Sequence, residues 1–203
     1  MGFSHEEMER AGLIIRREGK EGWYDRFRGR VMFPVFTVYG KVAGFGARIL
    51  TSRSDQPKYL NSPESTIYQK SQLLYGLYQA KGAIRKSERA ILVEGYSDVL
   101  MLHQAGIETA VATCGIAVTA DHAKALSRFA KNVVVMFDGD RSGNMASYRG
   151  IDVLLKEGLD VSVMRLPQGE DPDSFIRQHG VESFEKQLKD SVPFLDFRLH
   201  YVS

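Results

Sequence analysis

Cysteine and long apolar runs are the scarcest features of this 203-residue sequence. Its one cysteine, Cys114, excludes an internal disulfide and a thiolate metal cluster, and we expect it to be a small, partly buried residue rather than a nucleophile. No apolar run is long enough to cross a bilayer, and the first residues lack the basic and apolar regions of a signal peptide. These absences favour a cytoplasmic protein without a membrane partner.

Charge is divided unevenly along the chain. Residues 1–89 hold 16 lysines and arginines against 9 acidic residues, whereas residues 90–203 hold 11 against 16. A basic half joined to an acidic half favours a surface that binds a polyanion beside a site that binds a cation. Ordinary surface charge remains an open alternative at this point.

The first half of the chain predicts short elements of mixed type. A helix over residues 4–12 is expected, because Ser4 and Glu7 can form a capping box and Gly12 can end it. Further along, the sequence predicts a hairpin with strands 31–38 and 42–50, a polar irregular stretch over 51–66, and a helix over 73–83. Pro34 places the first hairpin strand at a sheet edge or a bulge.

From about residue 88 the pattern changes to alternating strands and helices. Strands are predicted at 90–94, 108–113, 132–138 and 160–166, and helices at 96–105, 119–130 with Thr119 as cap, 143–156, and in the tail 173–203. Such alternation is typical of an α/β fold with a mostly parallel sheet. We therefore predict a small mixed α+β subdomain over 1–87, an α/β domain over 88–172 and a helical segment over 173–203.

Carboxylates stand where two of these strands end. Glu94 closes the strand 90–94, and Asp138 and Asp140 close the strand 132–138. The carboxyl ends of parallel strands meet at one edge of a sheet, and Asp98, one helical turn beyond Glu94, can point back toward it. Because like charges repel, the cluster favours a divalent cation such as Mg²⁺ or Mn²⁺. The alternative is that each acid caps a helix, but three acids at two strand ends favour the metal.

A further acidic pair, Asp171 and Asp173, supports two interpretations. Asp171 before Pro172 is typical of a helix N-cap with proline at the first helical position. The strand 160–166 is also expected to end beside the strand 132–138, which would bring both acids to the same edge, where they could hold a second cation. The five histidines show no metal-ligand spacing and predict surface or packing roles; they are His5, His103, His122, His179 and His200.

Several segments together resemble a known family. Residues 94–98 (EGYSD) and 138–143 (DGDRSG) resemble the TOPRIM domain shared by topoisomerases and bacterial primases. The ordered segments 25–34, 57–64, 74–77 and 169–173 narrow the resemblance to the bacterial replicative primase of the DnaG type. It implies a Rossmann-like sheet flanked by helices, and a DNA-templated RNA polymerase that makes short RNA primers on single-stranded DNA from ribonucleoside triphosphates.

The resemblance also implies site residues. Glu94, Asp138 and Asp140 match catalytic and metal-binding positions, with Asp98, Asp171 and Asp173 as further metal ligands for Mg²⁺, for which Mn²⁺ substitutes. The nucleotide- and template-binding positions that match are Arg26, Arg28, Lys58, Tyr59, Asn61 and Lys70. Glu94 is expected to ligate a metal or to act as general base.

The residues themselves indicate how the basic positions would bind nucleic acid. Arg26, Arg28 and Arg30 alternate along what the sequence predicts to be an extended segment, so they can share one face and contact phosphates, and Tyr59 can stack on a base. The alternative is an exposed strand face with a packing tyrosine, and the resemblance favours nucleic acid.

The chain also departs from a whole primase. It has no cysteine and histidine cluster, so we expect the family's zinc-binding module to be absent, together with the start of the polymerase domain and the C-terminal helicase-binding domain. An excised core that works with a replicative helicase at the nucleoid is the expectation. Two alternatives stay open: a TOPRIM nuclease or topoisomerase-type subunit, and a nucleic-acid-binding fragment without turnover. Tyr96 is expected to pack rather than to act as a topoisomerase nucleophile.

Overall fold

The computed structural model describes residues 2–50, 56–137 and 145–201, and the chain divides into two compact units, residues 1–70 and 71–203. Each unit is described by itself. Compact units are defined by packing, whereas a domain must also be able to fold independently. The predicted domain boundaries at 87/88 and 172/173 therefore stay predictions.

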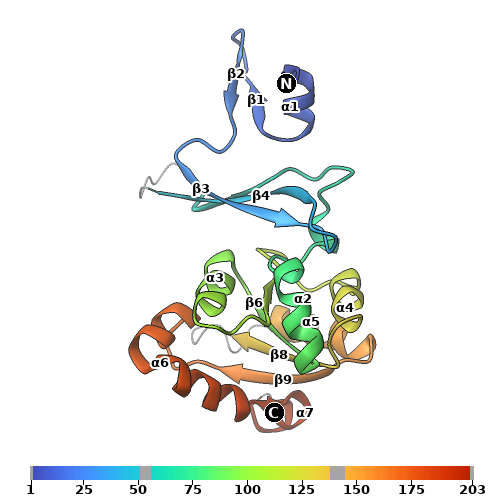
Figure 1. Cartoon of the computed structure of the whole chain (residues 1–203), viewed down its shortest axis with the longest axis vertical. Coiled ribbons are helices and arrows are strands. Elements are labelled where there is room, and N and C mark those ends of the chain that lie inside the picture. The colour runs from blue at the N-terminus through green and yellow to red at the C-terminus, as the bar shows by residue number, and fades with distance from the viewer. Residues whose placement is uncertain (1, 51–55, 138–144, 202–203) are drawn as a thin grey trace. The chain divides into compact units, whose positions relative to one another are not determined.

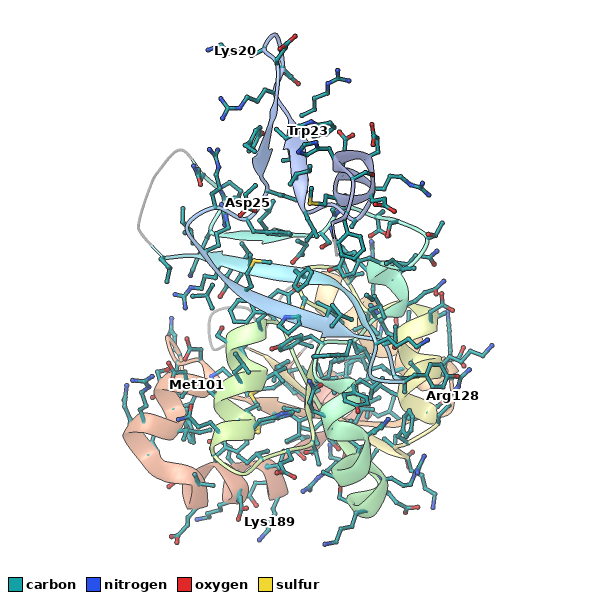
Figure 2. The ribbon with its side chains drawn as sticks, turned by 45° about the horizontal axis from the view of Figure 1, so that its top comes forward. Lys20, Trp23, Asp25, Met101, Arg128 and Lys189 are labelled. Atoms are coloured by element: carbon teal, nitrogen blue, oxygen red, sulfur yellow. The ribbon has the colours of Figure 1, made fainter. Side chains whose placement is uncertain are left out.

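The first unit begins with a capped helix and a short ribbon. Helix α1 (His5–Arg10) has Ser4 as N-cap, and Ser4 and Glu7 form the predicted capping box. Strand β1 (Ile14–Arg16) pairs antiparallel with β2 (Trp23–Asp25). The indole of Trp23 (Figure 2) stacks on the ring of His5 with centroids 5.6 Å apart, which ties the helix to the ribbon.

An antiparallel sheet completes the first unit, with β3 (Arg30–Phe36), β4 (Val42–Ile49) and β5 (Tyr59–Asn61) in the order β3-β4-β5. The predicted hairpin is confirmed, and Pro34 lies on the edge strand β3, two residues before a register shift. Strand β5 corrects the prediction of an irregular stretch over 51–66. It forms because it pairs with the free edge of β4, a tertiary contact that no local periodicity announces.

The second unit is the predicted α/β layer structure (Figure 1). Its strands are β6 (Arg89–Val93), β7 (Ala110–Ala112), β8 (Asn132–Phe137), β9 (Asp160–Arg165) and β10 (Val192–Pro193), in the order β10-β9-β8-β6-β7. All pairings are parallel except that of β10 with β9. The helices are α2 (Leu77–Ser87), α3 (Tyr96–Gln104), α4 (Ala120–Ser127), α5 (Met145–Lys156), α6 (Pro172–Lys189) and α7 (Phe194–Tyr201).

Alternation along the strands divides the core between the two faces of this sheet. Residues such as Leu92 and Val135 point to one face, where buried side chains of α2, α4, α5 and α7 join them in one apolar cluster. Their neighbours Ile91 and Val134 are also buried and point to the opposite face, as the strand period of two requires. A parallel sheet covered on both faces explains why its strands are almost wholly apolar.

Other boundaries differ from the predictions for identifiable reasons. Helix α2 begins at Leu77 rather than near residue 73, because Gly76 takes a left-handed conformation (φ 83°) and Tyr75 forms a β-bridge with Ala112. The tail is helical as predicted but contains the short strand β10, and α6 is interrupted at Gly180. Thr119 caps α4 as expected, by accepting a hydrogen bond from the amide of His122.

Over the described residues, we find no helix with the length and apolarity needed to cross a membrane.

Two glycines of the same region give a stability prediction. A Cβ at Gly76 would lie 2.8 Å from Val99 Cγ1 and 3.1 Å from the carbonyl oxygen of Ala110, whereas one at Gly82, inside α2, would meet nothing within 4 Å. We expect Gly76→Ala to lower the free energy of unfolding by at least about 1–2 kcal/mol, since its left-handed φ disfavours a side chain. Gly82→Ala should raise it by about 0.5–1 kcal/mol. Urea unfolding followed by circular dichroism measures both, and an unchanged midpoint for Gly76→Ala would contradict the close packing.

Candidate active site

The acidic residues lie at a topological switch point of the parallel sheet. Strand β6 pairs with both β7 and β8, so the chain leaves β6 toward one side and leaves β8 toward β9 on the other. Such a switch point opens a crevice at the carboxyl ends of the strands. Glu94 follows β6 at this crevice, and Leu92 pairs with Val135 close to it. Asp138 and Asp140 follow β8 in the sequence but lie outside the described residues.

Asp98 points back toward the start of its own helix, as predicted. Its Oδ2 accepts a hydrogen bond from the amide of Gly95 at 2.9 Å. Burial raises the pKa of the Asp98 carboxyl, the Gly95 bond partly opposes this, and the negative charges of Asp171 and Glu94 raise it further. The structure therefore brings Asp98 within electrostatic reach of both Glu94 and Asp171.

This arrangement suits a positively charged ligand. The Asp98 carboxyl, whose pKa is raised by burial and by the charges of Asp171 and Glu94, would gain from a cation placed beside it, and carboxylate oxygens are typical ligands of divalent cations. Within the described ranges, no group of three histidine, cysteine or carboxylate side chains is arranged to hold a metal ion by itself. A cation at this edge would therefore need ligands beyond these ranges, and Asp138 and Asp140 are the candidates in the sequence.

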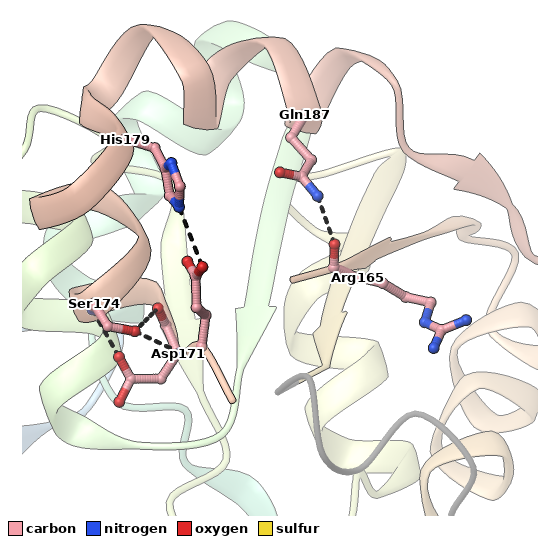
Figure 3. A network of polar contacts seen from close by, with 6 residues as sticks. Arg165, Asp171, Ser174, His179 and Gln187 are labelled. Atoms are coloured by element: carbon pink, nitrogen blue, oxygen red, sulfur yellow. Dashed lines mark hydrogen bonds and ion pairs between the residues drawn. The ribbon is translucent and has the colours of Figure 1, made fainter. Parts of the chain in front are cut away.

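Asp171 has the capping role that its proline predicts. Its Oδ1 accepts a hydrogen bond from the amide of Ser174 at 2.8 Å, and Ser174 Oγ accepts one from the amide of Asp171 at 2.9 Å (Figure 3). Asp173 instead binds Arg177, one turn further along α6, in an ion pair. Capping occupies one oxygen of Asp171 and leaves the other available for a cation. Metal binding by either residue stays a prediction.

Contacts along α6 hold the segment between β9 and this helix. His179 Nε2 lies 3.1 Å from Glu170 Oε1, and Gln187 Nε2 donates a hydrogen bond to the carbonyl of Arg165 at 2.7 Å (Figure 3). These bonds connect α6 to both ends of the segment that presents Asp171. The position of Asp171 is therefore determined by the helix as well as by its own cap.

Tyr96 and Cys114 are packing residues of the second unit. Tyr96 is 2% exposed, and its ring meets that of Tyr75 edge-on with centroids 4.7 Å apart. Burial raises the pKa of the Cys114 thiol well above its usual range, although a hydrogen bond with Tyr96 acts in the other direction. Burial likewise raises the pKa of Tyr75 to about 12. A thiol with a raised pKa is a poor nucleophile, in line with the packing role expected for Cys114, and the burial of Tyr96 against Tyr75 agrees with the packing role expected for that tyrosine.

Arg26 and Arg28 do not lie on an extended segment, which corrects that prediction for them, whereas Arg30 is the first residue of strand β3. Residues 26–29 form a turn between β2 and β3. The turn arises because Asp25 Oδ1 accepts a hydrogen bond from the amide of Phe27 at 2.9 Å, and because the Phe27 side chain, 5% exposed, enters the core. Arg26, Arg28 and Arg30 nevertheless line one groove of about 670 Å³, together with Pro57 and Leu60.

The other expected nucleotide-binding residues of this unit lie on β5 (Tyr59 and Asn61), just before it (Lys58), and at the start of a short 3-10 helix over Lys70–Gln72 (Lys70). Tyr59 is 36% exposed, with Lys58 Nζ and Arg48 Cζ at 5.8 and 5.9 Å from its ring centre. Arg48, its cross-strand partner on β4, was not predicted; its signal was a single charged residue within a mainly apolar strand. Asn61 pairs with Gly46, and the amide of Lys70 donates to Glu64 Oε1 at 3.2 Å. A row of cations around an exposed ring suits phosphate and base contacts.

Comparison with known proteins agrees with both halves of this geometry. Residues 1–81 match the N-terminal domain of the DNA primase catalytic core, and residues 91–176 match the Toprim-like family. The DNA primase of Clostridium acetobutylicum is 44% identical over 200 residues, which cover 98% of this chain and 33% of that protein. The chain thus spans about a third of the length of the curated relatives it matches.

Solved structures give the same result. A DNA primase domain from Pseudomonas aeruginosa is 40% identical, with a TM-score of 0.86 over 95% of this chain and 60% of that one. A DnaG primase catalytic domain bound to single-stranded DNA is 42% identical, with a TM-score of 0.84 over 93% of this chain and 61% of that one.

The parallel sheet with its acidic switch point and the matched family define a Toprim-type α/β domain, and the basic antiparallel unit before it matches the N-terminal domain of a DNA primase catalytic core. The chain belongs to the DnaG-type DNA primase family. The match over residues 1–81 favours this family over the nuclease or topoisomerase alternative, because the Toprim domain alone accounts only for the second unit.

Two variants of Asp171 separate its capping role from its charge. Asp171→Ala should lower the free energy of unfolding by about 1 kcal/mol through loss of the cap, whereas Asp171→Asn should leave it nearly unchanged, since asparagine caps as well as aspartate. If Asp171 also helps to hold a cation, both variants should weaken Mn²⁺ binding measured by calorimetry. Loss of Mn²⁺ affinity in Asp171→Ala alone would mean that the carboxylate charge is not used.

Proposed function

We propose that this chain is the catalytic core of a bacterial DNA primase, a DNA-templated RNA polymerase that makes short RNA primers on single-stranded DNA. The observation that carries the proposal is the group of carboxylates around Asp98 at the switch point of a Toprim-type sheet, in a chain whose other unit presents a groove lined by arginines. The single-stranded DNA bound to a related catalytic domain supports the choice of template. We propose ribonucleoside triphosphates as substrates and an RNA primer as product.

The acidic centre would serve nucleotidyl transfer. Glu94, Asp98, Asp138, Asp140, Asp171 and Asp173 are the residues that we propose to hold Mg²⁺, with Mn²⁺ able to replace it. Bound there, the cation would neutralise the charge that develops on the triphosphate. Glu94, in the crevice, would either complete the ligand set or accept the proton of the attacking 3′-hydroxyl. The half-buried setting of Asp98 strengthens all of these electrostatic interactions, because less water screens them.

The basic unit would bind template and incoming nucleotide. Arg26, Arg28, Lys58, Tyr59, Asn61 and Lys70 are the proposed contacts, to which the structure adds Arg48 as a candidate beside Tyr59. Phosphate contacts of this kind give affinity without reading the base sequence, as a template-directed enzyme requires. Coupling to a replicative helicase at a bacterial replication fork, and a zinc module, are proposed to belong to parts of the longer relatives that this chain does not match.

Calorimetric titration of Mn²⁺ into the chain, with and without a ribonucleoside triphosphate, tests this function. We expect the triphosphate to strengthen Mn²⁺ binding, because one acidic centre should hold both. Asp138→Asn/Asp140→Asn should lose the binding, whereas Asp152→Asn, which removes an exposed carboxylate from α5, should keep it. Mn²⁺ affinity that is unchanged by the triphosphate would favour a nuclease-type site. A folded chain that binds no Mn²⁺ would contradict the proposal.

Glu94→Gln distinguishes the two roles of Glu94. In either role the variant should abolish metal-dependent primer synthesis on single-stranded DNA while its circular dichroism spectrum is unchanged. If Glu94 is a ligand, Mn²⁺ affinity should fall with synthesis; if it is the base, Mn²⁺ affinity should be retained. Near-normal primer yield from Glu94→Gln would exclude both roles.

A further inference from the structure

The guanidinium group of Arg30 is committed to the backbone of another segment. Its Nη1 donates to the carbonyl oxygens of Pro57 at 2.9 Å and Lys58 at 3.4 Å, and its Nη2 lies 3.5 Å from Gln56 Oε1. Ile49, the cross-strand partner of Arg30, also donates its amide to the Lys58 carbonyl at 3.0 Å. Arg30 therefore reaches past the end of β4 and fastens the chain that enters β5.

Arg26 likewise bonds to the backbone at the other end of β5. Its Nη2 donates to the carbonyl of Asn61 at 3.3 Å, and its side chain is partly buried. The amide of the next residue, Ser62, donates a hydrogen bond to the carbonyl of Phe45 at 2.7 Å. The segment 57–61, which we call the β5 segment, is thus held at its entry by Arg30 and at its exit by Arg26.

The β5 segment needs such support. Strand β5 has three residues and, among the described strands, pairs with β4 alone, so it is a short edge strand with few hydrogen bonds of its own. Short edge strands of this kind open locally at low cost in free energy. Yet this segment presents Lys58 and Tyr59 to solvent, and a contact surface must be held in place to bind well.

Arg28 is different from its two neighbours. It is exposed, and its Cζ lies 4.6 Å from the ring centre of Tyr24, while no hydrogen bond from its guanidinium is found among the described residues. Stacking on Tyr24 orients the guanidinium and leaves its donors facing water. Over the described residues, Arg26 and Arg30 thus donate to backbone carbonyls of the protein, whereas the donors of Arg28 face solvent and can reach a ligand.

We propose that Arg30, assisted by Arg26, is a positioning residue that clamps the β5 segment so that Lys58 and Tyr59 can engage nucleic acid, whereas Arg28 contacts phosphate directly. The proposal rests on the proposed function. The spacing of the three arginines in the sequence suggests one row of phosphate contacts, and the proposal instead gives them two different roles. A clamp depends on the planar fork of arginine, so lysine should not replace Arg30. A phosphate contact on a single strand depends mainly on charge, so lysine should keep most of the binding at position 28 even though it loses the stacking on Tyr24.

The test compares lysine and glutamine at both positions in the whole chain. Binding of fluorescein-labelled oligo(dT) is followed by anisotropy over a range of salt concentrations, and amide hydrogen exchange is followed by mass spectrometry on peptides covering residues 56–62. Arg28→Lys should bind within about threefold of the parent, while Arg28→Gln should lower the slope of log Kd against log salt by about 0.7, the value for one phosphate on a single strand.

At position 30 both variants should behave alike. We expect Arg30→Lys and Arg30→Gln to speed exchange in the β5 segment by about tenfold, through local opening, and to weaken DNA binding with it. Exchange in the β3 peptides of the same unit should be unchanged. Parent-like binding and exchange in Arg30→Lys would overturn the clamp, as would faster exchange throughout the unit or weaker binding without faster exchange. A parent chain that binds no DNA would refute the proposed function, while the exchange data would still decide whether Arg30 clamps the segment.

Discussion

The parallel pairing of β6 with β8 is the constraint on which the acidic centre depends. Because β7 lies beyond β6 and β9 beyond β8, the connections diverge and leave a crevice at the carboxyl ends of the two central strands. The register that joins Leu92 to Val135 brings Glu94 to this edge. A slip of one residue would turn every side chain of β6 to the opposite face, and the apolar core on both faces opposes such a slip.

Near this edge of the sheet, a partly buried carboxyl lies close to other negative charges. Asp98 is partly removed from water beside Glu94 and Asp171, and its raised pKa records that cost. Local bonds hold the charges in place: the Gly95 amide binds Asp98, and the Ser174 amide binds Asp171. A fold that keeps repelling carboxylates in fixed positions is prepared for a cation, since little rearrangement is then needed on binding.

The basic unit is built by different means. Its groove depends on a turn that buries Phe27, and on a short edge strand to which Arg26 and Arg30 donate hydrogen bonds. On the function proposed here, the cationic side chains of this unit have two kinds of partner, the backbone of the protein and the ligand. A count of positive charges along the sequence does not distinguish side chains bound to the backbone from side chains that contact the ligand. Only those that contact the ligand contribute to the salt dependence of binding.

Local signals were sufficient for much of the fold. The capping box at Ser4, the caps at Asp171 and Thr119 and the alternation of apolar strands with helices act over a few residues, so the sequence by itself determined these elements, the α/β class and Glu94 at the end of β6. Only the tertiary structure decided that β5 exists and that residues 26–29 turn. Both depend on a partner distant in the chain: the free edge of β4 and the core that receives Phe27. Sequence spacing carries no record of such partners, because pairing between strands is chosen by the packing of the whole unit.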